Sequence, residues 1–207
     1  MSEMATEWGR SLSSVSLYAY RSGAGIVGSP DSAPSVPSGT PISISNFYSA
    51  YHGYEQTKYA TTYVDGSSLG YSSPTQALTN DGLFASCSVD HTNTDIGTFD
   101  WETFGFDSAI PSGATIVSVT LNIRNYHTGS GTITEKVAVY SGVTTKLAPT
   151  VVTHTSATVS TFSVSGMSRS DLLNANLKVE YTCTASSTGA SGTCYLDYAN
   201  LDVVWHL

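Results

Sequence analysis

The stretch TIVSVTLNIR, residues Thr115–Arg124, alternates apolar and polar side chains over almost its whole length. Val117, Val119, Leu121 and Ile123 share one parity, and Ser, Thr, Asn and Arg side chains take the other. Successive side chains of a strand point to opposite faces, so this pattern predicts a strand with one buried and one solvated face. Strands of this kind are typical of antiparallel sheets.

The same alternation recurs near the C-terminus, while helical periodicity is almost absent. NLKVEYTCT places Leu177, Val179, Tyr181 and Cys183 on one face, and a further inward series is formed by Ala199, Leu201, Val203 and Trp205. The expected helix is short, 168–175, with Ser168 as its N-cap and Asp171 in its first turn. Turns rich in Gly, Ser and Asn separate the strands. We therefore predict an all-β fold, an antiparallel β-sandwich of the jelly-roll type.

The first part of the chain differs in composition. Pro30, Pro34, Pro37 and Pro41 all lie in GSPDSAPSVPSGTP, which favours an extended polar tether over a packed element. We expect two regions: an extended N-terminal docking arm over residues 1–55 and the β-sandwich over residues 56–207.

The charge balance excludes several classes of partner. Eight basic and sixteen acidic residues give a net charge of −8, and no basic cluster interrupts the chain. Binding to nucleic acid or to an anionic membrane requires clustered Lys and Arg, so neither is expected. The N-terminal residues MSEMATEWGRS lack the features of a signal peptide, which predicts folding in a cytosol.

The three cysteines, Cys87, Cys183 and Cys194, form no zinc-binding or disulfide-framework spacing. Cys183 and Cys194 flank a loop and could face each other across a hairpin, which would require a bulge near Asp197. Since a cytosol keeps thiols reduced, we expect all three to be buried free thiols.

No catalytic or cofactor-binding motif is present. The five histidines are scattered, and the chain lacks nucleophile-elbow, HExxH and phosphate-loop motifs. The acidic loop SVDHTNTDIGTFDWE has no EF-hand spacing and is ordinary turn material. We predict a protein that is not an enzyme and needs no cofactor or metal.

The spacing of the aromatic residues in TFDWETFGF does not fit a single regular strand. Phe99 and Trp101 share one parity, whereas Phe104 and Phe106 share the other. A single strand cannot bury both pairs without a bulge or a change of register. Trp101 is therefore expected in the core or at a subunit contact, with stacking on a glycan ring as the alternative.

A second aromatic group lies beside the proline tether: Phe47, Tyr48, Tyr51, Tyr54 and Tyr59. Tyr is favoured at protein interfaces because it buries apolar area and keeps a hydroxyl partner. We predict that these residues dock on another protein. The alternative is an aromatic lid over the chain's own sandwich.

Two segments carry a resemblance to a known class of proteins. EWGRSLSSVSL (Glu7–Leu17) and PISISNFYSA (Pro41–Ala50) resemble an N-terminal module of small tailed-bacteriophage virion proteins, although Ser49 replaces the usual Gly. FGFDSAIPSGATIVSVTLNIR (Phe104–Arg124) is similar to jelly-roll segments of phage structural proteins.

The resemblance implies a non-enzymatic virion structural protein, assembled in the host cytoplasm. It would be tail-, baseplate- or fibre-associated, with a capsid decoration or cement protein, or a carbohydrate-binding host-adhesion module, as alternatives. The implied partners are other virion proteins, copies of the same chain in a trimer or larger ring, and a host surface glycan. The expected docking residues are Trp8, Arg10, Ile42, Ile44, Phe47, Tyr48 and Tyr51.

Overall fold

A computed structural model describes residues 54–93, 95–106 and 110–206. The expected docking residues, from Trp8 to Tyr51, lie outside the described residues. Residues Glu55–Val204 form one compact unit. No helix of the described part is long and apolar enough to cross a membrane.

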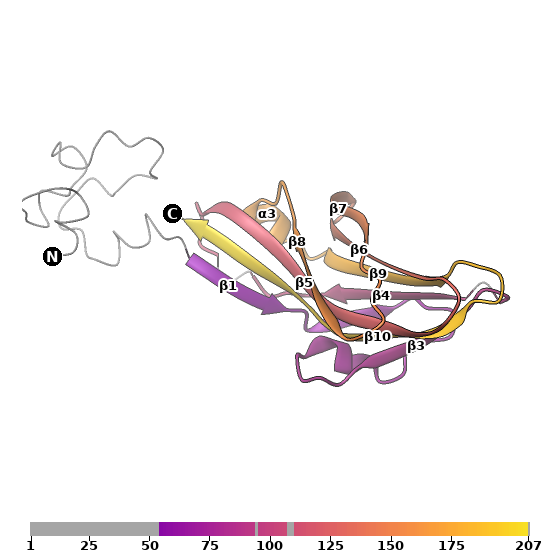
Figure 1. Cartoon of the computed structure of the whole chain (residues 1–207). Helices are drawn as coiled ribbons and strands as arrows, with labels where there is room; N and C mark the ends of the chain where they lie inside the picture. Colours follow the sequence, from indigo (N-terminus) through magenta and orange to yellow (C-terminus); the bar gives the residue numbers. More distant parts are fainter. Residues whose placement is uncertain (1–53, 94, 107–109, 207) are drawn as a thin grey trace, which may run out of the picture. The chain divides into compact units, whose positions relative to one another are not determined.

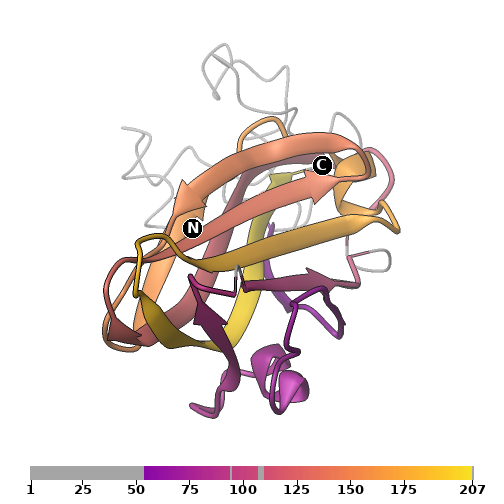
Figure 2. The same cartoon turned by 90° about the vertical axis from the view of Figure 1, so that its right-hand side faces the viewer.

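The described chain folds into two five-stranded sheets, which confirms the predicted β-sandwich. Sheet A has the strand order β1–β10–β5–β8, with β3 also pairing with β10, and sheet B has the order β2–β4–β9–β6–β7. Figures 1 and 2 show the two layers from two directions. The strands are β1 (Tyr54–Tyr59), β2 (Thr62–Asp65), β3 (Ala85–Asp90), β4 (Ile96–Glu102), β5 (Thr115–Ser130), β6 (Ile133–Ser141), β7 (Thr144–Val151), β8 (Thr158–Ser163), β9 (Leu177–Ala185) and β10 (Ser191–His206).

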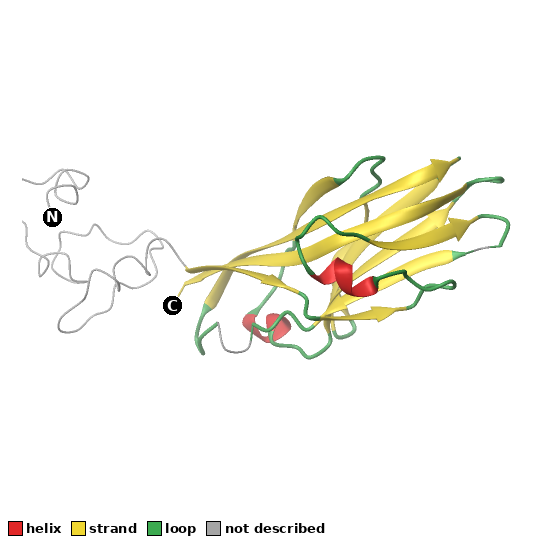
Figure 3. Cartoon of the chain, turned by 90° about the horizontal axis from the view of Figure 1, so that it is seen from below, coloured by secondary structure: helices red, strands yellow, loops and turns green. Residues whose placement is uncertain are grey.

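In the described part of the chain, helical structure is limited to short segments (Figure 3). The 3₁₀ helix η3 spans Pro74–Leu78, and α3 spans Arg169–Leu172, shorter than the sequence predicts. Ser168 caps α3 as expected: its side chain accepts from the Asp171 backbone N–H, and the Asp171 carboxylate accepts from the Ser168 N–H. Asp171 also pairs with Lys146 at 2.9 Å, and the hydrogen bonds from Ser168 and Lys146 outweigh burial and hold its pKa at about 2.

Strand β5 shows the alternation that decides the fold. Val119, Leu121 and Ile123 are buried in the core. The expected inward position of Val117 is wrong: it is 59% exposed near the start of the strand, before the residues that pair with β8. In the preceding turn Gly113 has a φ of 91°, a conformation that favours glycine.

The inward parity changes within β10. Cys194 and Leu196 face the core at the start of the strand, and Ala199 and Leu201 face it further along. One residue is therefore inserted near Asp197, the position at which a hairpin between Cys183 and Cys194 would have required a bulge. The insertion places Asp197 and Asn200 together on the outer face of sheet A.

The expectation of free thiols at Cys183 and Cys194 is wrong, because the two cysteines form a disulfide. Although β9 and β10 are consecutive, they belong to different sheets and do not form a hairpin ladder. Both side chains point inward, so their sulfurs meet across the core and link the two sheets. Only Cys87 is free, and it is buried.

A polar cluster also joins the sheets from inside. Glu135 of β6 is fully buried, and its carboxylate accepts hydrogen bonds from Asn125 Nδ2 (2.9 Å) and Tyr181 Oη (2.5 Å) and contacts His127 Nδ1 (2.9 Å). Asn125 and His127 come from β5 in sheet A, whereas Tyr181 comes from β9 in sheet B. A buried carboxylate is tolerated only with such a set of donors.

Candidate functional site

Trp101 is in the core and is not available to a glycan. Its side chain is fully buried, packs on Phe99 and Tyr181, and donates from Nε1 to the Ala77 carbonyl at 2.6 Å. The alternative of stacking on a sugar ring is therefore wrong for this residue, because η3 covers it. The expectation that Trp101 lies in the core is confirmed.

The register change predicted for this segment occurs at Thr103. Strand β4 ends at Glu102, and Thr103 adopts a φ of 55°, which is unusual for a non-glycine residue. The turn lets Phe104 and Phe106 enter the core although their parity is opposite to that of Trp101, so neither pair is exposed.

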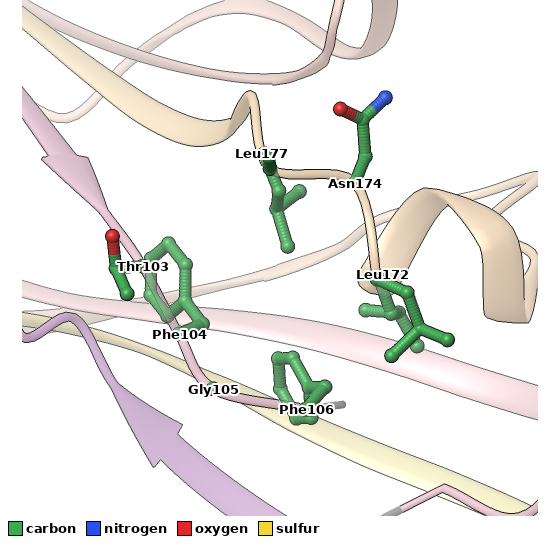
Figure 4. A pocket seen from close by; sticks show the side chains of 9 residues that line it. Thr103, Phe104, Gly105, Phe106, Leu172, Asn174 and Leu177 are labelled. Atoms are coloured by element: carbon green, nitrogen blue, oxygen red, sulfur yellow. The ribbon is translucent and has the colours of Figure 1, made fainter. Parts of the chain in front are cut away.

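The same turn borders a pocket at one end of the sandwich, with a volume of about 380 Å³. Figure 4 shows that the side chains of Phe104, Phe106, Leu172 and Leu177 converge on it. The polar side chains of its lining are those of Thr103 and Asn174. A sugar needs several convergent hydrogen-bond partners, and this pocket offers few, so it is a poor glycan site.

Of the tyrosines beside the proline tether, two lie in the described part of the chain and contact rings of β10. Tyr54 stacks on Trp205 with ring centroids 5.9 Å apart, and Tyr59 meets Tyr198 edge-on at 5.6 Å. For these two, the alternative of packing within the same chain holds. The predicted docking role stays a prediction for the others, which lie outside the described residues.

Aromatic side chains gather on the outer face of sheet A. Tyr126 of β5 and Tyr195 of β10 stack in parallel, with ring centroids 4.5 Å apart and an interplanar angle of 7°. Phe84, just before β3, stands perpendicular to both rings, at 5.1 Å from Tyr126 and 6.5 Å from Tyr195. All three are half-buried. With Arg124 they are called the aromatic platform below.

Arg124 is held in place by a carboxylate beneath it. Its Nη1 lies 2.7 Å from Asp197 Oδ2, and its guanidinium is 5.4 Å from the centre of the Phe84 ring. The Arg124 side chain is 29% exposed, whereas that of Asp197 is fully buried, and Oδ1 of Asp197 has no partner among the described residues. Burial raises the pKa of Asp197, and Arg124 opposes this shift. The arrangement presents guanidinium N–H donors next to aromatic rings.

A row of polar side chains crosses sheet A beside the platform. Asp202 accepts from Thr57 Oγ1 at 2.5 Å and from Asn122 Nδ2 at 2.7 Å. Asn122 also donates to Asn200 and accepts from Thr161. The row joins four of the five strands of sheet A, because Thr57 belongs to β1, Asp202 to β10, Asn122 to β5 and Thr161 to β8.

The alternation in Thr115–Arg124 predicts Asn122 and Arg124 on the solvated face of their strand, which is where they lie, but it does not predict the platform. Tyr126 continues the same outward parity beyond the TIVSVTLNIR stretch, and this signal could have been followed. Tyr195 and Phe84 carry no comparable signal, because their proximity to Tyr126 depends on which strands pair.

The histidines do not form a catalytic triad in the described part of the chain. His154 Nε2 lies 2.7 Å from Ser160 Oγ. The Glu135 carboxylate, however, contacts the ring of His127, and from His154 it accepts a hydrogen bond only from the backbone N–H. A serine nucleophile needs its histidine oriented by the acid side chain. Nor do the described residues include a group of three or more His, Cys, Asp or Glu arranged to hold a metal ion.

Comparisons with known proteins give a likeness of fold. No family model and no curated protein matches the chain. A xylan-binding module, CBM15, is 9% identical over 75% of this chain and 99% of its own, with a TM-score of 0.42. TmCBM61, solved in complex with β-1,4-galactotriose, gives 8% identity, coverages of 70% and 90%, and a TM-score of 0.36.

The CBM36-1 domain of a multidomain xylanase from the hindgut metagenome of Trinervitermes trinervoides is 10% identical over 72% of this chain and 96% of its own, with a TM-score of 0.34. At such values these likenesses assign no ligand to this chain.

Proposed function

We propose that the sandwich is a glycan-binding module and that its binding site is the outer face of sheet A. The observation that carries the proposal is the aromatic platform, in which half-buried rings stand beside the guanidinium donors of Arg124. A sugar ring has apolar C–H faces and a rim of hydroxyls. Aromatic rings can cover the former, and a few fixed polar groups can orient the latter.

The charges of this face favour uncharged sugars. Arg124 is the cation of the platform, and the carboxylate of Asp197 already neutralises it. Asp202 in the neighbouring polar row adds a negative charge. A sugar carboxylate or sulfate would meet like charges here, so neutral oligosaccharides are the proposed ligands.

Variants of the platform test the proposal. Tyr126→Ala and Tyr195→Ala should each weaken binding of a neutral oligosaccharide by about tenfold or more, since an aromatic anchor in a binding site contributes upwards of ~1.4 kcal/mol. Binding would be measured by glycan array and then by calorimetry on the full chain.

Tyr140→Ala is the matched control. Tyr140 is also a half-buried strand tyrosine, but it lies on β6 of the other sheet, with Lys178 Nζ 5.4 Å from its ring centre. The Tyr140→Ala variant should bind the oligosaccharide as tightly as the unaltered chain does. Equal loss in all three variants, or no binding to any neutral glycan, would contradict the proposal.

A second proposal concerns where the module works. We propose that the chain is a bacteriophage virion component, tail-, baseplate- or fibre-associated or a capsid decoration protein, and that residues 1–55 dock it on the particle. The motif of Pro41–Ala50 supports this proposal. A sandwich that adheres to host glycan is compatible with an arm that docks.

Replacing Ile44 and Phe47 by Ser tests the docking proposal. The double variant should express as a folded chain but be missing from assembled particles, because truncation of buried interface anchors typically costs upwards of ~2 kcal/mol each. Quantitative mass spectrometry of purified particles would measure the copy number. Incorporation at the level of the unaltered chain would refute docking through this motif, with no bearing on glycan binding.

A further inference from the structure

Three cysteines converge in the core from three different strands. Cys183 of β9 and Cys194 of β10 form the disulfide between the sheets. Cys87 of β3 lies directly opposite Cys194 in the antiparallel β3–β10 register. All three side chains are buried. A free thiol therefore lies beside an existing disulfide.

Gly97 lies beside two of these groups. It is the register partner of Cys183 on β4, and a methyl group added at its Cα would lie 3.2 Å from Tyr71 Oη, 3.4 Å from Cys87 Sγ and 3.6 Å from Cys183 Cβ. Because Gly97 has no side chain, the Cys87 sulfur and the Cys183 side chain both approach the same point beside its Cα. The Cys87 thiol is thus next to both partners of the disulfide.

The backbone geometry allows Cys87 and Cys194 to bond. Directly opposed residues of an antiparallel pair have Cβ atoms about 4.5–5.5 Å apart, and a disulfide requires about 3.5–4.5 Å. A small shift within the ladder therefore suffices. We propose that Cys87, Cys183 and Cys194 form a disulfide-exchange site, in which Cys194 is bonded either to Cys183 across the sheets or to Cys87 within sheet A.

The exchange is balanced without an added oxidant or reductant. The Cys87 thiol gives up its proton, and the thiolate sulfur attacks Sγ of Cys194. The Cys87–Cys194 bond forms while the Cys183–Cys194 bond breaks, and Cys183 leaves as a thiolate that takes up a proton. The chain keeps one disulfide and one thiol throughout.

The two pairings hold the sandwich differently. Cys183–Cys194 joins sheet A to sheet B, whereas Cys87–Cys194 joins two neighbouring strands that hydrogen bonds already pair. Exchange therefore releases the covalent link between the sheets. Burial raises the pKa of Cys87, whose S–H donates to the Ser88 carbonyl at 3.5 Å. Because the thiolate is the nucleophile, the exchange is favoured when the core opens locally and water reaches this sulfur.

Peptide mapping of the full chain tests the site. The protein is held without reductant in mildly alkaline buffer with a sub-denaturing amount of urea, trapped with iodoacetamide, and digested with pepsin in acid to prevent later scrambling. We expect two linked pairs, Cys183–Cys194 with alkylated Cys87 and Cys87–Cys194 with alkylated Cys183. Detection of Cys183–Cys194 alone under all conditions would overturn the proposal, as would a chain isolated with three thiols.

Two variants sharpen the result. Cys87→Ala should give only Cys183–Cys194, because the attacking thiol is gone. In the Cys183→Ala variant, oxidation should form the Cys87–Cys194 disulfide, because these are its two remaining cysteines. The mass of the non-reduced variant should then be lower than that of the reduced variant by two hydrogens. Two free thiols in Cys183→Ala after exposure to air would contradict the proposal.

Discussion

Glu135→Ala is expected to lower the free energy of unfolding by about 3–5 kcal/mol, the usual cost of removing one partner from a buried charged cluster. Glu135 is fully buried and is the shared acceptor of Asn125, Tyr181 and His127. Its removal takes this acceptor from Tyr181 and His127, whereas Asn125 Nδ2 still donates to the Val152 carbonyl at 2.9 Å. Burial, and then the Glu135 charge, raise the pKa of Tyr181 well above its ordinary value, so its hydroxyl keeps its proton and its role as donor.

Glu180→Ala is the matched control for this prediction. Glu180 is also a strand glutamate and lies 2.8 Å from Lys178, but its side chain is 26% exposed. Surface ion pairs of this kind contribute about 0–1 kcal/mol. Urea unfolding followed by tryptophan fluorescence would measure both variants. Similar small losses in the two would show that the Glu135 cluster does not hold the sheets together.

Removal of the disulfide is expected to have the second largest effect. Cys183 and Cys194 are separated by 11 positions in the sequence, and closing a loop of this size stabilises a fold by about 3 kcal/mol in the chain-entropy model. For a domain of this size, such a loss lowers Tm by roughly 10 °C. Calorimetry of the Cys183→Ala/Cys194→Ala double variant would measure it.

Cys87→Ala separates the cross-link from the packing. Cys87 is buried but outside the disulfide, so its replacement removes only a sulfur from the core. We expect this single variant to lose less than the double variant, about 1 kcal/mol. If the double variant melts at the temperature of the unaltered chain, the link between the sheets contributes nothing to stability.

Local pattern predicted much of this fold. The alternation around Leu121 and Val179 gave the inward faces of β5 and β9, because period-two burial is a property of each strand alone. The capping of α3 by Ser168 followed in the same way from neighbouring residues.

Features that depend on strand pairing could not be predicted. A strand–loop–strand sequence around Cys183 and Cys194 favours a hairpin, yet the two strands enter different sheets, and the disulfide follows from that topology. The platform has the same origin. The outward parity of Arg124 was readable from the sequence, but the meeting of Tyr126 with Tyr195 requires that β5 pair with β10.

Trp101 shows a further limit of sequence reasoning. Trp101 and Phe99 share one parity along the chain, and Phe104 and Phe106 share the other. The sequence pattern therefore allowed one of these two pairs to be exposed. The left-handed turn at Thr103 buries both pairs, and nothing in a threonine side chain predicts that conformation.

The most direct test of the central claim is an amide NMR titration of the full isotope-labelled chain with a neutral oligosaccharide that binds on an array. The account predicts that the largest shifts occur at Phe84, Arg124, Tyr126 and Tyr195 and extend to Asn122 in the polar row. Shifts confined to the outer face of sheet B around Tyr140, or to the pocket beside Phe104 and Leu177, would contradict it.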